Sequence, residues 1–409
     1  WGCFDEFNRL RLEVLSVCTV QYKSVLDALR GMDGDIPTRV VINGDEVNCK
    51  RTVMGIITMN PGYAGRATLP EGLKALFRPM TVMVPDMVLI CENMLMAEGF
   101  TEAKVLASKF YGLYALLRDL LSAQKHYDWG LRAVKSVLRV AGSMLRAEPE
   151  LDEAAILMRA LRDSNTAKII QEDEPIFFGL LGDLFPGLDP PRKIDPNLKA
   201  ALVETCEKLQ LWPDTDYIDR CMQLAELLSI RHCVFLLGPP GCGRTEVIRG
   251  LAGAQGVQGR KTKIEYLNPK ALSPKELYGY ITSATREWRD GMLSDILRSL
   301  GLIPNEEPKW IALDGDLDTI WIESMNSVMD MNKTLTLASN ERIPLKPHMR
   351  MLFEIDSLAN ATPATVSRAG ILYINASDVG YFPFVESWVE KRTDQREMAT
   401  LPGLFHKYM

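Results

Sequence analysis

The sequence predicts two α/β modules in tandem, each with a parallel sheet, and an all-α region that follows the first sheet. Two segments, 1–9 and 310–316, each place an aspartate at the end of a short apolar strand. A glycine-rich loop, 238–245, lies between an apolar strand and a helix, which is the local order of a phosphate-binding loop. With 409 residues the chain is also too long for one compact core, so several domains are expected.

The composition is that of a globular chain, since 47% of the residues are hydrophobic and 24% are charged. The net charge of −6, without a long basic block, argues against a nucleic-acid surface. No apolar run approaches the roughly 18 residues that span a bilayer, and the sequence shows no signal peptide. The eight cysteines and four histidines are scattered, so we expect reduced, mostly buried thiols and no metal centre built from them.

The first α/β block is predicted to contain two strands, a helix and a hairpin. A strand ends at Asp5, and the apolar residues of 12–29 follow helical spacing. After a turn-rich segment, 31–37, a hairpin is expected around Asn43-Gly44, a pair that suits a type I′ turn. The apolar run 53–59 predicts a buried parallel strand.

From residue 85 to residue 185 the pattern becomes helical. One buried helix face is predicted from the 3-4 spacing of Leu106, Phe110, Leu113, Leu117 and Leu120. Further helices are predicted at 127–146, 151–166 and 175–184. Prolines and glycines at 186–191 form the clearest linker in the chain.

The second block begins after this linker and repeats the first. It is predicted to have a helical stretch to residue 230, a strand at 233–237, a helix from the glycine loop to about 251, and an α/β pattern through 371. Asp5 followed by Glu13–Val17 corresponds to Asp314 followed by Glu323–Val328. A duplication of such a long period, with strands and helices, indicates tandem α/β modules.

The glycine loop is the first candidate binding element, and it consists of Gly238, Pro239, Pro240, Gly241, Cys242, Gly243, Arg244 and Thr245. Its backbone N–H groups and the following helix N-terminus can converge on phosphate, and Thr245 can hold Mg²⁺. Arg244 replaces the usual lysine, which keeps the charge but exchanges a compact ammonium for a planar fork. With Asp314 as a candidate Mg²⁺ ligand, the loop predicts nucleotide binding; the alternative is a plain glycine-rich turn.

The two acidic motifs differ at the position that orients the attacking water in ATPases with such loops. The first has Glu6 directly after Asp5, whereas the second has Gly315 after Asp314. We therefore expect hydrolysis at the first site and binding with little or no hydrolysis at the second. Along a continued strand, Asp316 would point with Asp314 and not toward the water; if the strand ends earlier, the role of Asp316 stays open.

Three further polar residues fit the first site. Asn60 ends a strand expected to lie beside that of Asp5, where its side chain can touch the attacking water. Arg132 lies near the start of a helix after the first sheet, and Arg368 follows the second acidic motif, so both are candidates to reach a γ-phosphate. The alternatives are a surface acidic pair at Asp5 and Glu6 and an ordinary ion pair for each arginine.

Longer motifs resemble the motor region of dynein heavy chains, a ring of six AAA+ P-loop NTPase modules. They are Trp1–Arg9, Ile57–Tyr63, Leu76–Pro79, His126–Ala133, Thr285–Trp288, Trp321–Val328 and Ala361–Arg368. The resemblance covers essentially the whole chain, and Gly62–Arg66 and Leu337–Ile343 are more similar to axonemal, outer-arm-type chains than to the cytoplasmic one. It implies the back of a first module and most of a second, each with a parallel-sheet α/β large subdomain and an all-α small subdomain.

The resemblance also implies roles for single residues. Asp5 would be the Mg²⁺ ligand and Glu6 the catalytic carboxylate of the principal ATPase site, with Asn60 and Arg132 as sensor residues and Arg368 as the arginine finger. The adenine of the second site would lie at Leu211, Trp212 and Pro213. The implied segments are 1–85 and 86–188 for the first module's large and small subdomains, 189–376 for the second large subdomain and 377–409 for the start of the second small one.

The function that the resemblance implies is an ATP-driven microtubule motor of the cytoskeleton, in the axoneme of a cilium or flagellum. ATP or ADP and Mg²⁺ would be its cofactors. The implied partners are the other modules of the ring, microtubules, and dynein intermediate and light chains, with no nucleic acid and no membrane. The alternatives are a non-motor AAA+ remodelling ring and a nucleotide-clamped structural scaffold.

Both ends of the sequence are expected to be cuts within a longer chain. The first module's own phosphate loop is expected before Trp1, so the isolated fragment is expected to be inactive.

Overall fold

The computed structural model describes residues 1–31, 38–60, 68–191 and 195–408, which divide into two compact units, 1–85 and 86–409. Three sequence features lie outside these residues: most of the predicted turn 31–37, the part of the Ile57–Tyr63 motif that follows Asn60, and the Gly62–Arg66 motif. Each unit is described by itself.

The first unit is organised by a parallel pair of strands, β1 (Gly2–Phe4) and β4 (Gly55–Ile57). Between them come η1 (Phe7–Arg9), α1 (Leu12–Arg30), β2 (Thr38–Ile42) and β3 (Asp45–Cys49), and α2 (Glu71–Lys74) follows. The predicted hairpin is confirmed, because β2 pairs with β3 and both Asn43 and Gly44 have positive φ, 54° and 93°, as a type I′ turn requires.

The helical region of the second unit confirms the predicted helices, with corrections at their ends. It consists of α3 (Met87–Glu98), α4 (Ala103–Leu120), α5 (Leu131–Ala147), α6 (Glu153–Thr166) and α7 (Glu174–Leu184). Leu106, Phe110, Leu113 and Leu117 are buried as predicted, but Leu120 is 53% exposed. Because α4 ends there and the chain becomes extended, Leu121 is buried in its place.

The predicted helix 127–146 begins later than expected, at Leu131. Residues 127–130 form a turn in which the carboxylate of Asp128 accepts a hydrogen bond from the Gly130 N–H at 2.9 Å. The rings of Tyr127 and Trp129 pack against the helical core from this turn. The segment is therefore apolar without being helical.

In the described part of the second unit, a five-stranded parallel sheet has the order β13-β5-β12-β9-β6. The strands are β5 (Cys233–Leu237), β6 (Lys263–Leu267), β9 (Lys309–Asp314), β12 (Met349–Ile355) and β13 (Gly370–Tyr373). Every residue of β5 is buried, as expected for a parallel strand that is covered on both faces. The parallel α/β fold class is thus confirmed.

Alternate residues of these strands face two helical layers. Leu236 and Leu352 pack with α8 (Pro196–Leu209), α9 (Thr215–Ile230) and α10 (Arg244–Val257), which runs past the predicted end near residue 251. Phe235 and Phe353 pack on the other face with α11 (Pro274–Tyr278), α12 (Met292–Leu302), α13 (Thr319–Ile322) and α14 (Asn326–Met329).

Smaller elements complete the second unit. They are η2 (Pro269–Ala271), β7 (Gly279–Ile281) paired with β8 (Trp288–Asp290), η3 (Glu323–Met325), β10 (Thr334–Thr336) paired with β11 (Arg342–Pro344), α15 (Pro363–Val366), α16 (Ala376–Val379), α17 (Phe382–Glu390) and α18 (Gln395–Tyr408).

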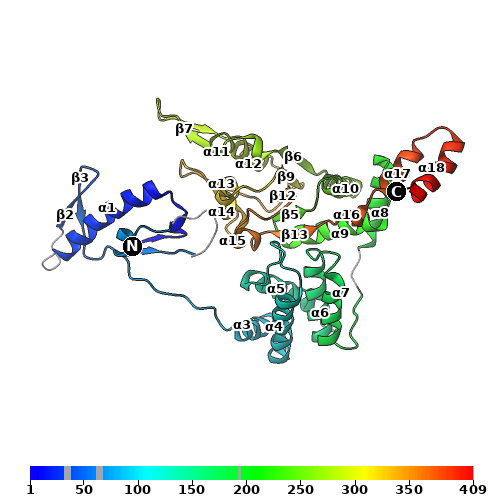
Figure 1. Cartoon of the computed structure of the whole chain (residues 1–409), viewed down its shortest axis with the longest axis horizontal. Helices are drawn as coiled ribbons and strands as arrows, with labels where there is room; N and C mark the ends of the chain where they lie inside the picture. Colours follow the sequence, from blue (N-terminus) through cyan, green and yellow to red (C-terminus); the bar gives the residue numbers. More distant parts are fainter. Residues whose placement is uncertain (32–37, 61–67, 192–194, 409) are drawn as a thin grey trace. The chain divides into compact units, whose positions relative to one another are not determined.

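The helical region joins the sheet at its β13 edge (Figure 1). The N–H of Tyr373, in β13, donates to the carbonyl of Ala167 at 2.7 Å. The ring of Tyr373 also stacks on that of His126, with the ring centroids 5.0 Å apart. Helices that the sequence assigns to the first module therefore form one compact unit with the sheet of the second.

Among the described residues all eight cysteines are unpaired, and six of them are buried, which confirms the expected thiols. No helix in the described part of the chain combines the length and apolarity needed to cross a membrane.

Candidate nucleotide-binding sites

The glycine loop lies where the sequence predicts, between β5 and the N-terminus of α10. Gly241 and Gly243 have positive φ, 83° and 95°, which glycine adopts without strain. At Gly238 a Cβ atom would lie 2.4 Å from the carbonyl oxygen of Ile374, so a side chain is excluded there by close packing. The first N–H groups of a helix have no intrahelical partner, so the start of α10 makes this loop a suitable cradle for phosphate.

Arg244, at the position of the usual lysine, is turned back onto its own loop. Its Nη1 donates to the Gly238 carbonyl at 2.8 Å and lies 2.6 Å from a carboxylate oxygen of Asp356, beyond the end of β12. Asp356 was not found from the sequence, because its contact with Arg244 depends on β5 and β12 being neighbours in the sheet.

A carboxylate that was not found from the sequence lies beside Thr245 and Asp314, the predicted Mg²⁺ residues. The Thr245 hydroxyl donates to Oε2 of Glu354 at 2.5 Å, and Glu354 on β12 is in register with Asp314 on β9. Glu354 is only 3% exposed, and this burial raises the pKa of its carboxyl group, as does the nearby Asp314. The sequence feature that could have identified Glu354 is a single charged residue near the end of an otherwise apolar run.

The donor set of this site suits a hard divalent cation. Hydroxyl and carboxylate oxygens are the ligands that Mg²⁺ prefers, and it usually takes one or two carboxylates together with substrate phosphates. In the described residues no cluster of three or more His, Cys, Asp and Glu side chains is placed to hold a metal ion by itself. Thr245 and Asp314 therefore fit a cation that is shared with a bound nucleotide.

Gly315, which follows Asp314, has a backbone conformation and a close neighbour that both disfavour a side chain at this position. Gly315 has φ of 154°, and a Cβ atom there would lie 3.1 Å from Oδ1 of Asn268. β9 ends at Asp314, so strand alternation does not govern Asp316, whose carboxylate lies 3.0 Å from Nζ of Lys270. The backbone of this loop thus favours glycine where the first module carries Glu6.

In the first unit, Asp5, Glu6 and Asn60 lie at the same end of the β1–β4 pair. The Thr58 hydroxyl donates to the Asp5 carboxylate, and the Glu6 N–H donates to Oγ1 of Thr58 at 3.0 Å. Nδ2 of Asn8 donates to the Asn60 carbonyl at 3.1 Å. Glu6 adopts left-handed backbone angles, φ 52° and ψ 45°, which are strained for a residue with a side chain and recur at functional sites.

In the second unit, Arg132 and Arg368 line one cavity of about 530 Å³. Arg132 lies in the first turn of α5, and its Nη1 donates to Oγ of Ser367 at 3.0 Å. Arg368 is held by the Ala364 carbonyl at 2.7 Å and by Asp330, whose carboxylate lies 2.9 Å from Nε. The ion pair that was the alternative interpretation is therefore present for Arg368, whereas the described partner of Arg132 is a serine hydroxyl.

The sequence reasoning missed the other cations of this cavity, which are Lys135, Arg139, Arg231 and Lys333. Lys135 and Arg139 follow Arg132 at helical spacing, which was a usable signal. Arg231 and Lys333 come from distant parts of the chain. The cavity is well suited to an anion by charge.

Leu211, Trp212 and Pro213 lie between α8 and α9. The Trp212 N–H donates to Oγ of Ser387 in α17 at 2.7 Å, which ties this segment to the helices that end the chain. The Trp212 side chain is 38% exposed. Its contact with adenine stays a prediction.

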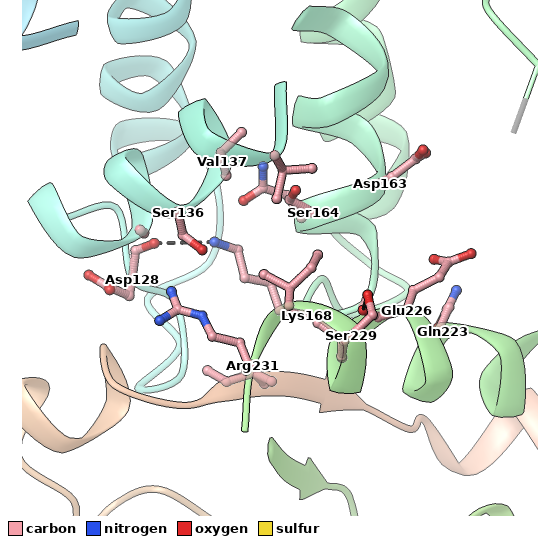
Figure 2. A pocket seen from close by; sticks show the side chains of 18 of the residues that line it. Asp128, Ser136, Val137, Asp163, Ser164, Lys168, Gln223, Glu226, Ser229 and Arg231 are labelled. Carbon is pink, nitrogen blue, oxygen red and sulfur yellow. Dashed lines mark hydrogen bonds between the residues drawn. The ribbon is translucent and has the colours of Figure 1, made fainter. Parts of the chain in front are cut away.

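A further cavity, of about 410 Å³, lies between the helical region and the second sheet. Figure 2 shows Lys168 and Arg231 in it, with Nζ of Lys168 donating to the Asp128 carbonyl at 3.2 Å. Burial lowers the pKa of Lys168 to about 8, and it also lowers the pKa of Arg231. This cavity was not predictable from the sequence, because its lining comes from elements that are far apart along the chain.

His126, at the edge of this cavity, makes the junction with β13 sensitive to acid. Its Nε2 lies 2.9 Å from the Lys168 carbonyl, and burial lowers its pKa from 6.5 to about 4. The unfolded chain therefore takes up this proton first as the pH falls. The stabilisation that neutral His126 provides is complete above about pH 6.5 and is lost toward pH 4.

We expect the opening free energy of the junction to fall by about 2 kcal/mol between pH 7 and pH 5. Hydrogen exchange of the Tyr373 amide, after correction for its intrinsic rate, measures this opening. His126→Gln keeps a donor for the Lys168 carbonyl and should abolish the pH dependence, whereas His406→Gln on α18 should preserve it. An unchanged pH dependence in His126→Gln would exclude His126 as its source.

The comparisons with known proteins agree on one family. Residues 1–245 match the family described as the hydrolytic ATP-binding site of the dynein motor region, and residues 233–369 match the AAA domain of the dynein-related subfamily. The chain is 55% identical to dynein axonemal heavy chain 9 of Homo sapiens and 54% identical to the ciliary dynein beta chain of Tripneustes gratilla, each over 409 residues and 100% of this chain.

The dynein alpha chain of the flagellar outer arm of Chlamydomonas reinhardtii is 54% identical over 422 aligned residues, which include 96% of this chain. The chain spans about 9% of the length of each of these relatives. The matching segments contain both acidic motifs and the glycine loop, so nucleotide binding is a property of the matched domains. On this match, which extends over more than half of its residues, the chain belongs to the dynein heavy chain family.

Proposed function

We propose that this chain is part of the ATP-driven ring of a microtubule motor in a cilium or flagellum. The observation that carries the proposal is the match of residues 1–245 to the hydrolytic ATP-binding site of the dynein motor region. The axonemal, ciliary and flagellar names of the relatives support the location. They also favour a motor over a remodelling ring or a scaffold. The other modules of the ring, microtubules, and intermediate and light chains are its proposed partners.

The two modules have different roles, hydrolysis of ATP in the first and retention of nucleotide in the second. In the first, Asp5 holds Mg²⁺, Glu6 orients the attacking water and Asn60 contacts that water. Arg132 and Arg368 then stabilise the negative charge that develops on the γ-phosphate. This assignment is supported by the cluster of Asp5, Glu6 and Asn60 at one strand end and by the cationic cavity that contains both arginines.

The second module holds nucleotide without efficient hydrolysis. Its loop, 238–245, cradles phosphate, while Thr245 and Asp314 hold Mg²⁺ and the segment 211–213 covers the adenine. Gly315 offers no carboxylate to water, and its backbone is unsuited to one. The proposed large and small subdomains are 1–85 and 86–188 for the first module, and 189–376 and 377–409 for the second.

We expect the purified full-length motor to retain unhydrolysed ATP at the second site. Glu6→Gln disables the first site, and the protein is then incubated with ATP, desalted and denatured for chromatography of the released nucleotide. The difference from the same protein with Asp314→Asn should be about one ATP per chain. Recovery of ADP alone in that difference would contradict the proposal, and no difference would indicate that Arg244 prevents binding.

A further inference from the structure

The two modules carry different residues at one equivalent place on the strand beside the acidic motif. In the first, Phe4 is in register with Ile57, which places Thr58 beside Asp5, and its hydroxyl donates to the Asp5 carboxylate. In the second, Glu354 is in register with Asp314. The second module therefore lacks the carboxylate of Glu6 but gains one on the neighbouring strand.

One carboxylate oxygen of the buried Glu354 side chain has no hydrogen-bond partner among the described residues to compensate for its burial. Its Oε2 accepts the Thr245 hydroxyl at 2.5 Å, but Oε1 is buried and has no hydrogen-bond partner among the described residues. A buried carboxylate oxygen without a partner costs free energy. Arg244, a nearby cation, is paired with Asp356 instead.

The bond to Thr245 leaves that residue able to hold a cation. A hydroxyl has one donor hydrogen and two acceptor lone pairs, so Thr245 can donate to Glu354 while its oxygen binds a metal ion. Thr245, Asp314 and Glu354 together offer the hard oxygen ligands that Mg²⁺ or Mn²⁺ prefers.

We propose that Glu354 is a third protein ligand, with Thr245 and Asp314, for the divalent cation that accompanies nucleotide in the second module. The proposal rests on nucleotide binding by this module. The second carboxylate is thereby moved from the place where it would orient water to a place where it holds the cation. The site is specialised for retaining its ligand.

The test is a titration of the full-length heavy chain with Mn²⁺, in saturating adenylyl imidodiphosphate, with free Mn²⁺ measured by electron paramagnetic resonance. Glu354→Gln keeps an oxygen that accepts from Thr245 but removes the charge. We expect one Mn²⁺ site per chain to weaken by at least about 10–100-fold, because replacing even the residues that only orient metal ligands typically costs that much affinity. Glu354→Thr copies Thr58 of the first module and should weaken the same site. It replaces the glutamine variant in the test if that variant folds poorly.

Two controls make the result decisive. Asp314→Asn should weaken one site per chain, and Glu265→Gln, on β6 of the same sheet and paired with Lys263, should weaken none. If both Glu354 variants overlay the wild-type titration while Asp314→Asn loses a site, Glu354 is only a hydrogen-bond acceptor and the inference is overturned. If Asp314→Asn also loses none, the proposed cation site of the second module fails as well.

Discussion

Replacing Arg368 with alanine should lower the steady-state ATPase rate of the full-length motor by roughly 10³–10⁵-fold, the effect of losing an arginine finger. Arg368 is oriented by the Ala364 carbonyl and by Asp330, in a cavity that it shares with Arg132. The competing interpretation is that the ion pair with Asp330 is its whole role. The Arg368 side chain is 9% exposed and that of Asp330 is 36% exposed, so this pair is partly buried and contributes more than the roughly 1 kcal/mol of a fully exposed pair.

The measurement compares turnover with melting temperature in two variants. Arg368→Ala should abolish most turnover, whatever its effect on the melting temperature, whereas Arg342→Ala, at an exposed arginine in β11, should change neither turnover nor melting temperature. If Arg368→Ala lowers the melting temperature and leaves turnover intact, the residue is structural.

Glu6→Gln should lower the turnover rate by about 10²–10⁴-fold, the usual contribution of a general base. Glutamine keeps the size of the side chain, and the Glu6 N–H can still donate to Thr58, so the strained turn should be preserved. We therefore expect ATP to bind normally while hydrolysis and microtubule gliding stop.

Single-turnover hydrolysis, ATP binding and gliding speed check this expectation. Glu13→Gln, an exposed acid in the first turn of α1, is the matched control and should leave all three unchanged. Gliding near the wild-type speed in Glu6→Gln would exclude the catalytic role.

The parts of the fold that depend only on residues adjacent along the chain were predictable from the sequence. The Asn43-Gly44 turn and the phosphate loop before α10 follow from backbone preferences that need no distant partner. The position of Arg132 near the start of α5 was also predicted, although the helix begins at Leu131 and not at residue 127.

Features that depend on which strands are neighbours were not predictable. Glu354 and Asp356 lie beside the glycine loop and Asp314 because β12 is between β5 and β9. No spacing along the chain encodes that strand order. Leu120 shows the same limit on a smaller scale, because helical periodicity does not reveal the residue at which a helix ends.

The bond between Tyr373 and Ala167 has a consequence for how the protein can be divided. β13 is the outer strand of its sheet, and an uncovered outer strand invites pairing with other chains. The helices before the linker occupy the Tyr373 N–H and cover its ring through His126. A protein cut at the linker 186–191 would lose this cover and become prone to self-association. The linker that marks the module boundary in the sequence is therefore a poor place to separate the two modules.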